Sequence, residues 1–508
     1  MLRVLLGIVS TGAILAFILI ALHWPFTEAA VIKSLQQASS SKVEVGKFRS
    51  TYFPHPGCVA AGVIFRRELN ANTPPLVTVQ RLTIQGSYLG LVTKHVPRIR
   101  TEGMTIFIPS QSGHEKFRSS SDVTIDEWIA DDAGLEFGSR IPGKPPLKFA
   151  IHQCRLYGVG GVSPVRFRVK LTNPEPPGEI TAHGNIGPWR VGDATQTPVS
   201  GEYLFEHANL GVFGGIAGLL SSSGKFDGTL GRIKVEGTTD TPEFKVTDSS
   251  HRVDLKSQFN AFVNAKTGDV ELAQVDAHFW KTSVISSGRV ARKGSTRVTE
   301  LDMRSREGRI EDLLDLVITD SKPPITGVTS FRGHVVLPAG NGPFLKKIAL
   351  QGEFGVGAGN FTKPETQEDV NKLSAEARAQ DDQNAATVLS DLKGHVVLKG
   401  GVAQFSYLSF TIPGAFAIMQ GTYDVISEKI NLHGVLRLDS SLSHTAHGPK
   451  ALLLKALQPF FKRKSKGSKI AVKITGTYDH PSFGLDLTGQ KEDATTKRLR
   501  RLYQKPTK

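Results

Sequence analysis

The sequence predicts a mainly β protein in which one membrane-spanning helix precedes a long series of strands with few helices between them. Two patterns in the 508 residues support this class. Many short stretches alternate apolar and polar residues, which is typical of strands with one apolar and one solvated face. Glycine, proline, asparagine and aspartate separate these stretches about every 10 to 15 residues, as hairpin connections require.

Residues 1–25 are predicted to be a transmembrane anchor. The segment "VLLGIVSTGAILAFILIAL", Val4–Leu22, contains no ionisable residue and is about as long as a helix that crosses ~30 Å of hydrocarbon. Arg3 precedes it and Trp24 follows it, so the positive-inside rule places the N-terminus in the cytoplasm and the body across the membrane. A cleaved signal peptide is the alternative, although its apolar core is usually only about 7 to 15 residues long.

Charge and cysteine content limit the partners. The formal net charge is +15, which suits nucleic acid or an anionic membrane surface, and a body across the membrane disfavours nucleic acid. "KRKSKGSK" at 462–469 and "KRLRRLYQK" at 497–505 are either headgroup-binding patches or solvated segments. Cys58 and Cys154 are too few for a disulfide scaffold, and their state does not follow from the sequence.

The clearest alternation lies near the C-terminus and predicts four strands. They are "SYLSFTIPG" at 406–414, "KINLHGVLRLD" at 429–439, "KIAVKITGT" at 469–477 and "PSFGLDL" at 481–487. "MTIFIP" at 104–109 and "FRVKLTNP" at 167–174 show the same pattern more weakly. Within each C-terminal stretch the apolar residues are expected to share one face. These residues are Leu408, Phe410, Ile412, Ile430, Leu432, Leu436, Leu438, Val472, Ile474, Phe483 and Leu485.

A few segments predict short helices or turns. "RIEDLLDLVI" at 309–318 is amphipathic, "GVFGGIAGLLSSSG" at 211–224 is an apolar turn or helix, and "EDVNKLSAEARA" at 368–379 is a polar helix. "KALLLKALQPFFKRK" at 450–464 either packs over a sheet end or lies on a membrane surface.

One corner motif is repeated. "GTTDTPEF" at 237–244 and "GTYDHPSF" at 476–483 share their spacing, and "GTYD" recurs at 421–424. We expect strand–turn–strand corners, because the aspartate can close a local turn and the proline, which lacks an N–H, suits the start of a strand. The repetition suggests one architecture that is extended along the chain.

The sequence shows none of the catalytic motifs H-E-x-x-H, P-loop or G-x-S-x-G, so neither an enzyme activity nor a cofactor is expected. His444 and His447 in "HTAH" are interpreted as loop histidines, since no third metal ligand is evident. His55 and Cys58 in "PHPGC" are interpreted as part of a Pro-Gly turn.

The order of these segments resembles the AsmA family of Gram-negative envelope proteins, which is related to TamB and the chorein-like bridge lipid-transfer proteins. At the N-terminus the anchor is followed by "WPF" and by "VIKSLQQASSSKVEVGKFRSTYFPHPGC" at 31–58. At the other end, "IPGAFAIMQGTYDVISEKINLHGVLRLD" at 412–439 and "KIAVKITGTYDHPSFGLDL" at 469–487 resemble the AsmA-like C-terminal region. The resemblance covers nearly the whole chain but rests on segment order, not on a catalytic motif.

The resemblance implies a long antiparallel sheet that curls into an open groove lined with apolar side chains. The strands alone leave three options, since their apolar faces can be buried by sandwiching, closing or curling around an apolar ligand. In the groove, the eleven C-terminal residues named above become candidate lipid contacts. The expected regions are an anchor at 1–25, an AsmA-like N-terminal β region at 26–200, a middle β region with short helices at 201–365, an AsmA-like C-terminal β region at 366–490 and a basic tail at 491–508.

The expected function is that of an inner-membrane-anchored periplasmic protein that conducts phospholipid acyl chains along this groove between the envelope membranes. About 30 strands at ~4.8 Å spacing would extend ~140 Å, which is short for spanning a periplasm alone. Two alternatives stay open: an assembly factor for outer-membrane proteins, which needs exposed strand edges, and a structural β scaffold, whose faces pack against each other. The candidate partners are phospholipid, the inner membrane, and outer-membrane or periplasmic proteins.

Overall fold

The structure is a computed structural model, and it describes most of the chain between residues 25 and 486. The described ranges are 25–66, 74–108, 123–138, 146–190, 193–247, 249–294, 296–318, 322–340, 342–368, 371, 390–438, 469–477 and 480–486. The expected anchor at 4–22, the helix at 450–464, most of the helix at 368–379, His444, His447 and the basic tail lie outside these ranges. None of the helices in the described ranges combines the length and the apolar character needed to cross a membrane.

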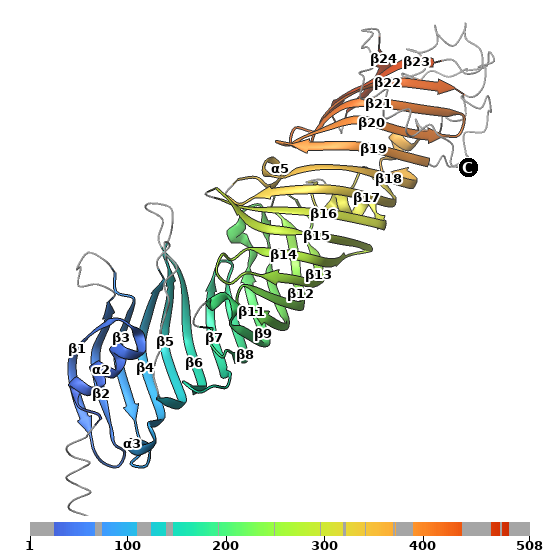
Figure 1. Ribbon diagram of the computed structural model, residues 1–508. Coiled ribbons are helices and arrows are strands. Elements are labelled where there is room, and N and C mark those ends of the chain that lie inside the picture. Colours follow the sequence, from blue (N-terminus) through green and yellow to red (C-terminus); the bar gives the residue numbers. More distant parts are fainter. Residues whose placement is uncertain are drawn as a thin grey trace, which may run out of the picture. The chain divides into compact units, whose positions relative to one another are not determined.

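The protein is mainly β, as the sequence predicts. The described strands, β1 to β24, belong to one long mixed sheet that is not closed into a barrel, and almost every strand pairs with the next strand along the chain (Figure 1). By internal contacts the chain divides into two compact units, which we call unit 1 (residues 1–208, 223–234 and 264–267) and unit 2 (residues 209–222, 235–263 and 268–508). This division does not test the expected boundaries at 200 and 365, which stay predictions.

Unit 1 contains the first nine strands and the N-terminal helix. Its elements are α2 (Glu28–Ser39), β1 (Lys42–Thr51), β2 (Gly57–Arg66), β3 (Val77–Gln85), α3 (Gly90–Thr93), β4 (His95–Ile108), β5 (Thr124–Phe137), β6 (Leu147–Val159), β7 (Val165–Pro174), β8 (Pro177–Ile186), the 3₁₀ helix η1 (Ala194–Gln196) and β9 (Pro198–Asn209). The segment that follows has parts in both units and contains η2 (Leu210–Phe213), β10 (Ile216–Ala217), β11 (Leu219–Thr229) and β12 (Arg232–Val246).

Unit 2 continues the same sequential pairing. Its elements are β13 (Val253–Val263), β14 (Val270–Phe279), β15 (Thr282–Lys293), β16 (Thr296–Arg309), α4 (Ile310–Asp315), β17 (Ile325–Pro338), α5 (Phe344–Lys347), β18 (Ala349–Phe361), β19 (Ser390–Lys399), β20 (Val402–Ile412), β21 (Ala415–Asp424), β22 (Lys429–Leu438), β23 (Lys469–Thr477) and β24 (Pro481–Leu485). All four strands expected from the C-terminal alternation are present as β20, β22, β23 and β24.

One strand pair departs from the expected antiparallel sheet. Strands β4 and β5 run parallel, with His95 in register with Thr124 and Ile108 in register with Phe137. Parallel neighbours need a connection of a dozen or more residues, and residues 109–123 provide that length. Alternation within a strand carries no information about its direction, so the sequence could not reveal this pair.

The N-terminal helix α2 packs on the apolar face of the first strands. Its N-cap is Thr27, whose hydroxyl accepts a hydrogen bond from the Ala30 N–H at 3.3 Å, and its C-cap Ser40 adopts the left-handed conformation. Figure 1 draws α2 beside the first strands. Val31 is buried, and with Phe26 it joins a core cluster that includes residues of β1 to β6.

The amphipathic stretch at 309–318 forms α4, as predicted. Asp312 on α4 is buried, and its carboxylate accepts hydrogen bonds from the Lys281 N–H at 3.0 Å and from the Thr282 hydroxyl at 2.7 Å. Both donors lie where β14 turns into β15, so α4 is fixed over this end of the sheet by a satisfied buried carboxylate. The stretch at 211–224 forms no long helix but η2, β10 and the start of β11.

The corner predicted at 237–244 is wrong. This whole segment lies inside β12, which continues to Val246. Asp240 closes no turn, because its carboxylate lies 4.0 Å from the Lys256 ammonium of β13, and the Thr239 hydroxyl lies 2.6 Å from that of Ser257. The chain adapts to Pro242 with a positive φ of 55° at Glu243, which is a kink within the strand and not a hairpin.

The other two corners are confirmed. Gly476 (φ 102°) lies in register with Pro481, which starts β24. At the β21–β22 turn, the Asp424 carboxylate accepts hydrogen bonds from the N–H groups of Ile426 at 2.9 Å and Ser427 at 3.0 Å. These two bonds, of which that from Ser427 contributes most, lower the pKa of Asp424.

We predict that Asp424→Ala loosens the β21–β22 hairpin. The lost hydrogen bonds contribute about 1 kcal/mol, so amide exchange in residues 421–432 should accelerate about fivefold at neutral pH. Because the pKa of Asp424 is lowered in the folded state, its contribution is complete above the unfolded pKa and is lost as the pH falls through the folded pKa. Exchange measured by mass spectrometry should therefore show a smaller difference from wild type in acid. Asp424→Asn keeps an acceptor oxygen and serves as the control; an equal acceleration in both variants would contradict the turn-closing role.

Candidate functional site: an apolar sheet face

The candidate site is the apolar face of the sheet, and in unit 1 it is built from cross-strand rows. Residues directly opposite each other on neighbouring strands project to the same face. The strand registers join one residue from each of the nine strands into a single row that is apolar except for one threonine. This row is Phe48, Ala60, Leu82, Thr101, Ala130, Cys154, Val169, Ala182 and Tyr203.

A second row runs parallel to the first on the same face. It consists of Ser50, Cys58, Ile84, Ile99, Trp128, Leu156, Phe167, Gly184 and Gly201. The two rows are separated by one residue along each strand, so together they form an apolar band across all nine strands of unit 1.

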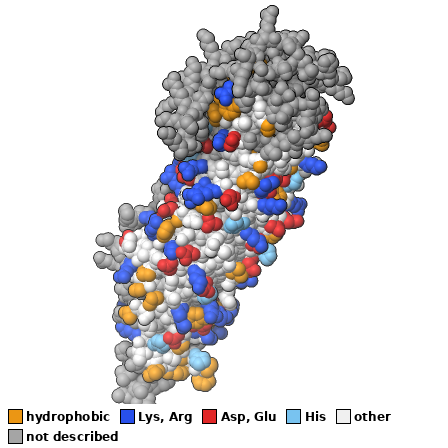
Figure 2. All heavy atoms as spheres, turned by 90° about the vertical axis from the view of Figure 1, so that its right-hand side faces the viewer, with side chains coloured by type: hydrophobic (Ala, Val, Ile, Leu, Met, Phe, Trp, Pro, Cys, Tyr) orange, Lys and Arg blue, Asp and Glu red, His pale blue; other side chains and the backbone are white. Residues whose placement is uncertain are grey.

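The residues between the two rows lie on the opposite face, which is charged. From β4 onward they are Arg100, Ile129, Arg155, Arg168, His183 and Glu202. Ion pairs bridge strands on this face: the Arg98 and Arg100 guanidinium groups of β4 lie 2.8 and 2.7 Å from the Glu127 and Asp131 carboxylates of β5. Figure 2 shows basic and acidic side chains interspersed over the surface in view. One face of the sheet is thus suited to water and the other is not.

The apolar band of unit 1 is closed at its first strands and more open farther along. Phe26 and α2 take part in the buried cluster with Val43, Val63 and Val79. On β7 the apolar residues Val165, Phe167, Val169 and Leu171 are only half-buried, while Arg166, Arg168 and Lys170 are exposed. All described strands belong to one sheet, so the described residues supply no second sheet that could cover this part of the face.

In unit 2 the registers place all eleven sequence-predicted residues on one face of β20 to β24. Phe405, Gly421, Leu432, Ile474 and Phe483 form one row, and Leu408, Met419, Gly434, Val472 and Leu485 form the next. Phe410 is in register with Ala417 and Leu436, Ile412 with Ala415 and Leu438, and Ile430 with Tyr423. The side chains of Leu438, Phe483 and Leu485 lie outside the described ones.

The eleven residues differ in accessibility. Ile412 and Leu436 are only 1% and 5% exposed, and they share a buried cluster with Ala415, Ala417 and Ile470. Half-buried side chains are those of Leu408, Phe410, Ile430, Leu432, Val472 and Ile474. A charge introduced at Leu436 would therefore disrupt packing before it could report on binding.

Sequence reasoning missed the corresponding face of unit 1, although it noted the stretch at 167–174. Irregular positions in unit 1 change the phase of the alternation. Gly62 and Gly103 adopt left-handed φ values of 66° and 60° and are skipped in the ladder without a register shift, whereas the register between β6 and β7 shifts at His152. A two-residue period read straight through such a position assigns every later side chain to the wrong face.

Glycines on this face accommodate aromatic rings of the neighbouring strand. Phe354 is in register with Gly394, where an added Cβ would lie 2.7 Å from the ring, and a Cβ on Gly201 would lie 2.7 Å from the Phe226 ring. Both rings therefore occupy the space that a side chain at the glycine would take. A ring placed in this way lies over the backbone of the glycine and covers it with apolar surface.

Both cysteines lie on the apolar band of unit 1 and both are free thiols. Cys58 is on β2 and Cys154 on β6, four strand spacings or ~19 Å apart, whereas a disulfide needs Cα atoms within ~7 Å. Burial raises the pKa of the Cys58 thiol to about 12, and it also raises the pKa of Cys154. His55 lies exposed in the β1–β2 turn, as expected, whereas Cys58 lies in strand β2 and not in the turn.

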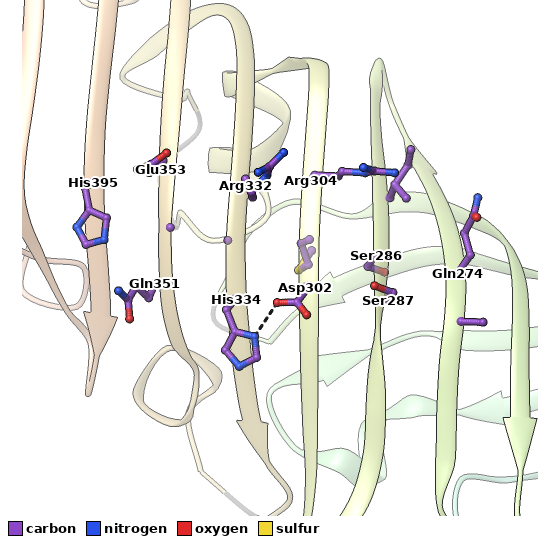
Figure 3. Close-up of a pocket in the computed structure, with 15 residues that line it drawn as sticks. Gln274, Ser286, Ser287, Asp302, Arg304, Arg332, His334, Gln351, Glu353 and His395 are labelled. Atoms are coloured by element: carbon purple, nitrogen blue, oxygen red, sulfur yellow. Dashed lines mark hydrogen bonds and ion pairs between the residues drawn. The ribbon is translucent and has the colours of Figure 1, made fainter. Parts of the chain in front are cut away.

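A polar hollow of about 640 Å³ lies on the opposite, charged face of unit 2 (Figure 3). It is lined by side chains of β14 to β19, among them the His334 imidazole, which lies 2.9 Å from the Asp302 carboxylate, and the two arginines Arg304 and Arg332, which are directly opposite each other. In the part of the chain that the structure describes, no group of three or more metal-ligating side chains is present. The hollow is open, and most of the side chains that line it are polar or charged, with Ala273, Ile285 and Met303 between them.

Comparisons with protein-family models, with curated proteins and with solved structures found no match to this chain. The resemblance to AsmA proteins therefore stays a prediction from the segments quoted above, and the site must be judged by its own geometry.

The two thiols provide a test of this geometry. We predict that Cys58 resists alkylation at pH 8, because it is fully buried and a pKa of about 12 leaves roughly one thiol in ten thousand ionised. Cys154, half-buried where it packs against the edge of the same cluster, should react faster than Cys58 but more slowly than after unfolding. Peptide mass spectrometry of the iodoacetamide-treated native protein measures both rates; equal rates for the two thiols would show that the band is uniformly open or uniformly closed.

Proposed function

We propose that the protein binds phospholipid acyl chains on the apolar face of its sheet and conducts them between membranes of the cell envelope, anchored by residues 1–25 in the inner membrane with the body in the periplasm. The observation that carries the proposal is the apolar band of unit 1, which continues through nine strands and is only half-buried on β7. The proposal agrees with the AsmA resemblance and adds no enzyme activity and no cofactor.

The hydrophobic effect supplies the driving force. Each methylene group removed from water contributes about 0.8 kcal/mol, so an acyl chain is costly to expose to the periplasm and far less costly on an apolar face. A band in which nearly every strand contributes an apolar side chain lets the acyl chain exchange one set of apolar contacts for the next. Movement then needs no step at which the whole lipid tail returns to water.

The charged face supports the same role in a different way. Cross-strand ion pairs such as Arg289 with Glu300 and Arg98 with Glu127 hold neighbouring strands together on the solvated side. Exposed pairs of this kind add little stability, but opposite charges on neighbouring strands favour one register over its alternatives. Headgroups and water can therefore remain outside while the tails occupy the apolar side.

The structural-scaffold alternative has one observation in its favour. The buried cluster around Ile412, Ala417 and Leu436 is closed in the manner of an ordinary core. If the whole face were filled like this cluster, no lipid would bind. The experiment must therefore report on the more open part of the face and not on the cluster.

Cys154 and Val169 provide a local test, because they are directly opposite each other on β6 and β7. Added phospholipid should slow alkylation of Cys154 severalfold in the full-length protein and leave Cys58 unchanged. We predict that Val169→Asp removes this protection and the lipid that co-purifies in this region, since a carboxylate is costly to cover with an acyl chain.

Lys170→Asp is the matched control, because Lys170 neighbours Val169 but is exposed and projects to the charged face. It should retain lipid protection of Cys154. Thermal unfolding of both variants shows whether either has lost its fold. A wild-type protein that carries no phospholipid, and whose Cys154 rate does not respond to lipid, would refute lipid binding and leave the scaffold alternative.

A further inference from the structure

Two loops at one end of unit 1 are tied to each other and to the point where the described chain begins. They are residues 51–56, between β1 and β2, and residues 86–91, between β3 and β4, which we call the paired loops. The Tyr88 hydroxyl donates to the Tyr52 carbonyl at 2.6 Å and the Gly86 N–H to the Pro56 carbonyl at 2.7 Å.

The same loops lie beside Phe26, only four residues after the expected anchor ends at Leu22. The Ser50 hydroxyl, at the end of β1, donates to the Phe26 carbonyl at 2.8 Å. A Cβ added to Gly86 would lie 2.7 Å from the Phe26 ring, so this ring packs directly on the second loop. The paired loops are thus fixed next to the site where the chain enters the body.

These loops expose four large hydrophobic side chains. Tyr52, Phe53, Tyr88 and Leu89 are 61%, 87%, 52% and 78% exposed. In Figure 2 hydrophobic side chains also gather at the lower end of the molecule, the level at which Figure 1 draws α3. Single exposed apolar residues are ordinary on a protein surface, whereas several on two touching loops mark a binding surface.

Basic residues greatly outnumber acidic ones in the part of the sequence that contains these loops. Residues 45–67 and 69–101 contain no aspartate or glutamate, while Lys47, Arg49 and Lys94 are basic and exposed. Acidic groups outside these residues pair with some of their basic ones: the Asp126 carboxylate of β5 lies 2.8 Å from the His95 imidazole, and Glu127 and Asp131 pair with Arg98 and Arg100. Tyrosine, other aromatic and basic residues together are the composition that membrane interfaces favour.

We propose that the paired loops dip into the headgroup region of the bilayer that residues 4–22 cross, with Phe53 and Leu89 entering deepest. The surface that these loops contact is a lipid surface for two reasons. Only a few residues separate the proposed anchor from the body that carries the loops, so the loops lie close to the bilayer. In addition, the basic residues complement anionic headgroups. The contact fixes the orientation of the body relative to the membrane. A single helix followed by a short connection does not fix this orientation. The inference rests on the proposed anchor but not on lipid transport.

The test uses the full-length protein in vesicles of phosphatidylglycerol and phosphatidylcholine that is brominated near the headgroup. Bromine quenches tryptophan only at close range, so Leu89→Trp and Phe53→Trp report whether the loops lie in the bilayer. Val162→Trp is the matched control, because Val162 is 94% exposed in the β6–β7 turn of the same unit, four strand spacings or ~19 Å from β2 and two spacings or ~10 Å from β4. The native protein, with its four tryptophans, supplies the background to subtract.

We expect the added fluorescence of Leu89→Trp and Phe53→Trp to fall at least about twofold in brominated vesicles, and that of Val162→Trp to stay unchanged. No quenching of either loop tryptophan, in a protein that resists carbonate extraction from the vesicles, overturns the proposal while leaving the anchor intact. Equal quenching of all three overturns it as well, since contact would then not be specific to the paired loops. Extraction by carbonate would instead refute the anchor. Lipid protection of Cys154, measured separately, decides the transport proposal.

Discussion

The structure depends on cross-strand register. In unit 1 an apolar residue faces an apolar residue across nearly every strand boundary from Phe48 to Tyr203, and a slip of one residue at any boundary would turn every later apolar side chain toward the charged face. Register is held by features that a simple alternation lacks: left-handed glycines that release one residue from the ladder, tight turns closed by side chains such as Asp424, and ion pairs on the solvated face. Each acts on one strand boundary, and together they keep the band continuous.

Much of the fold could be predicted from the sequence, because alternation and helix patterning are local signals. The strands β20 to β24, helix α4 and the turns at 421–424 and 476–483 follow from residues that lie next to each other in the chain. The corner at 237–244 could not be distinguished from these by its letters, yet it lies within β12, where neighbouring strands and not the Gly-Thr-x-Asp pattern decide the conformation. The parallel pair of β4 and β5 and the register shift at His152 are likewise set by tertiary contacts.

The sequence predicted which residues share the apolar face, but it did not predict how buried each of them is. Alternation correctly grouped Leu408, Phe410 and Ile430 on one side of the C-terminal strands. It gave no means to separate these half-buried residues from Ile412 and Leu436, because burial depends on what packs above a face and not on which face a residue occupies. For the same reason the residues opposite Val169 became visible only once the registers of all nine strands were known.

The closed beginning of the band constrains how an acyl chain could reach its more open part. Phe26 and Val31 seal the apolar side chains of the first strands, so a lipid that arrives from the anchor end encounters protein core and not an open trough. The helix α2 is held there by one buried valine, by Phe26 and by partly buried neighbours such as Leu35, which is a modest contact for a helix of 12 residues. Lipid entry at this end therefore requires either that α2 lifts from the face or that the chain passes over the strand ends to reach β7. Cys58 is fully buried in this cluster, whereas Cys154 packs against its edge four strands farther along, so lifting α2 would expose Cys58 and passage over the strand ends would not.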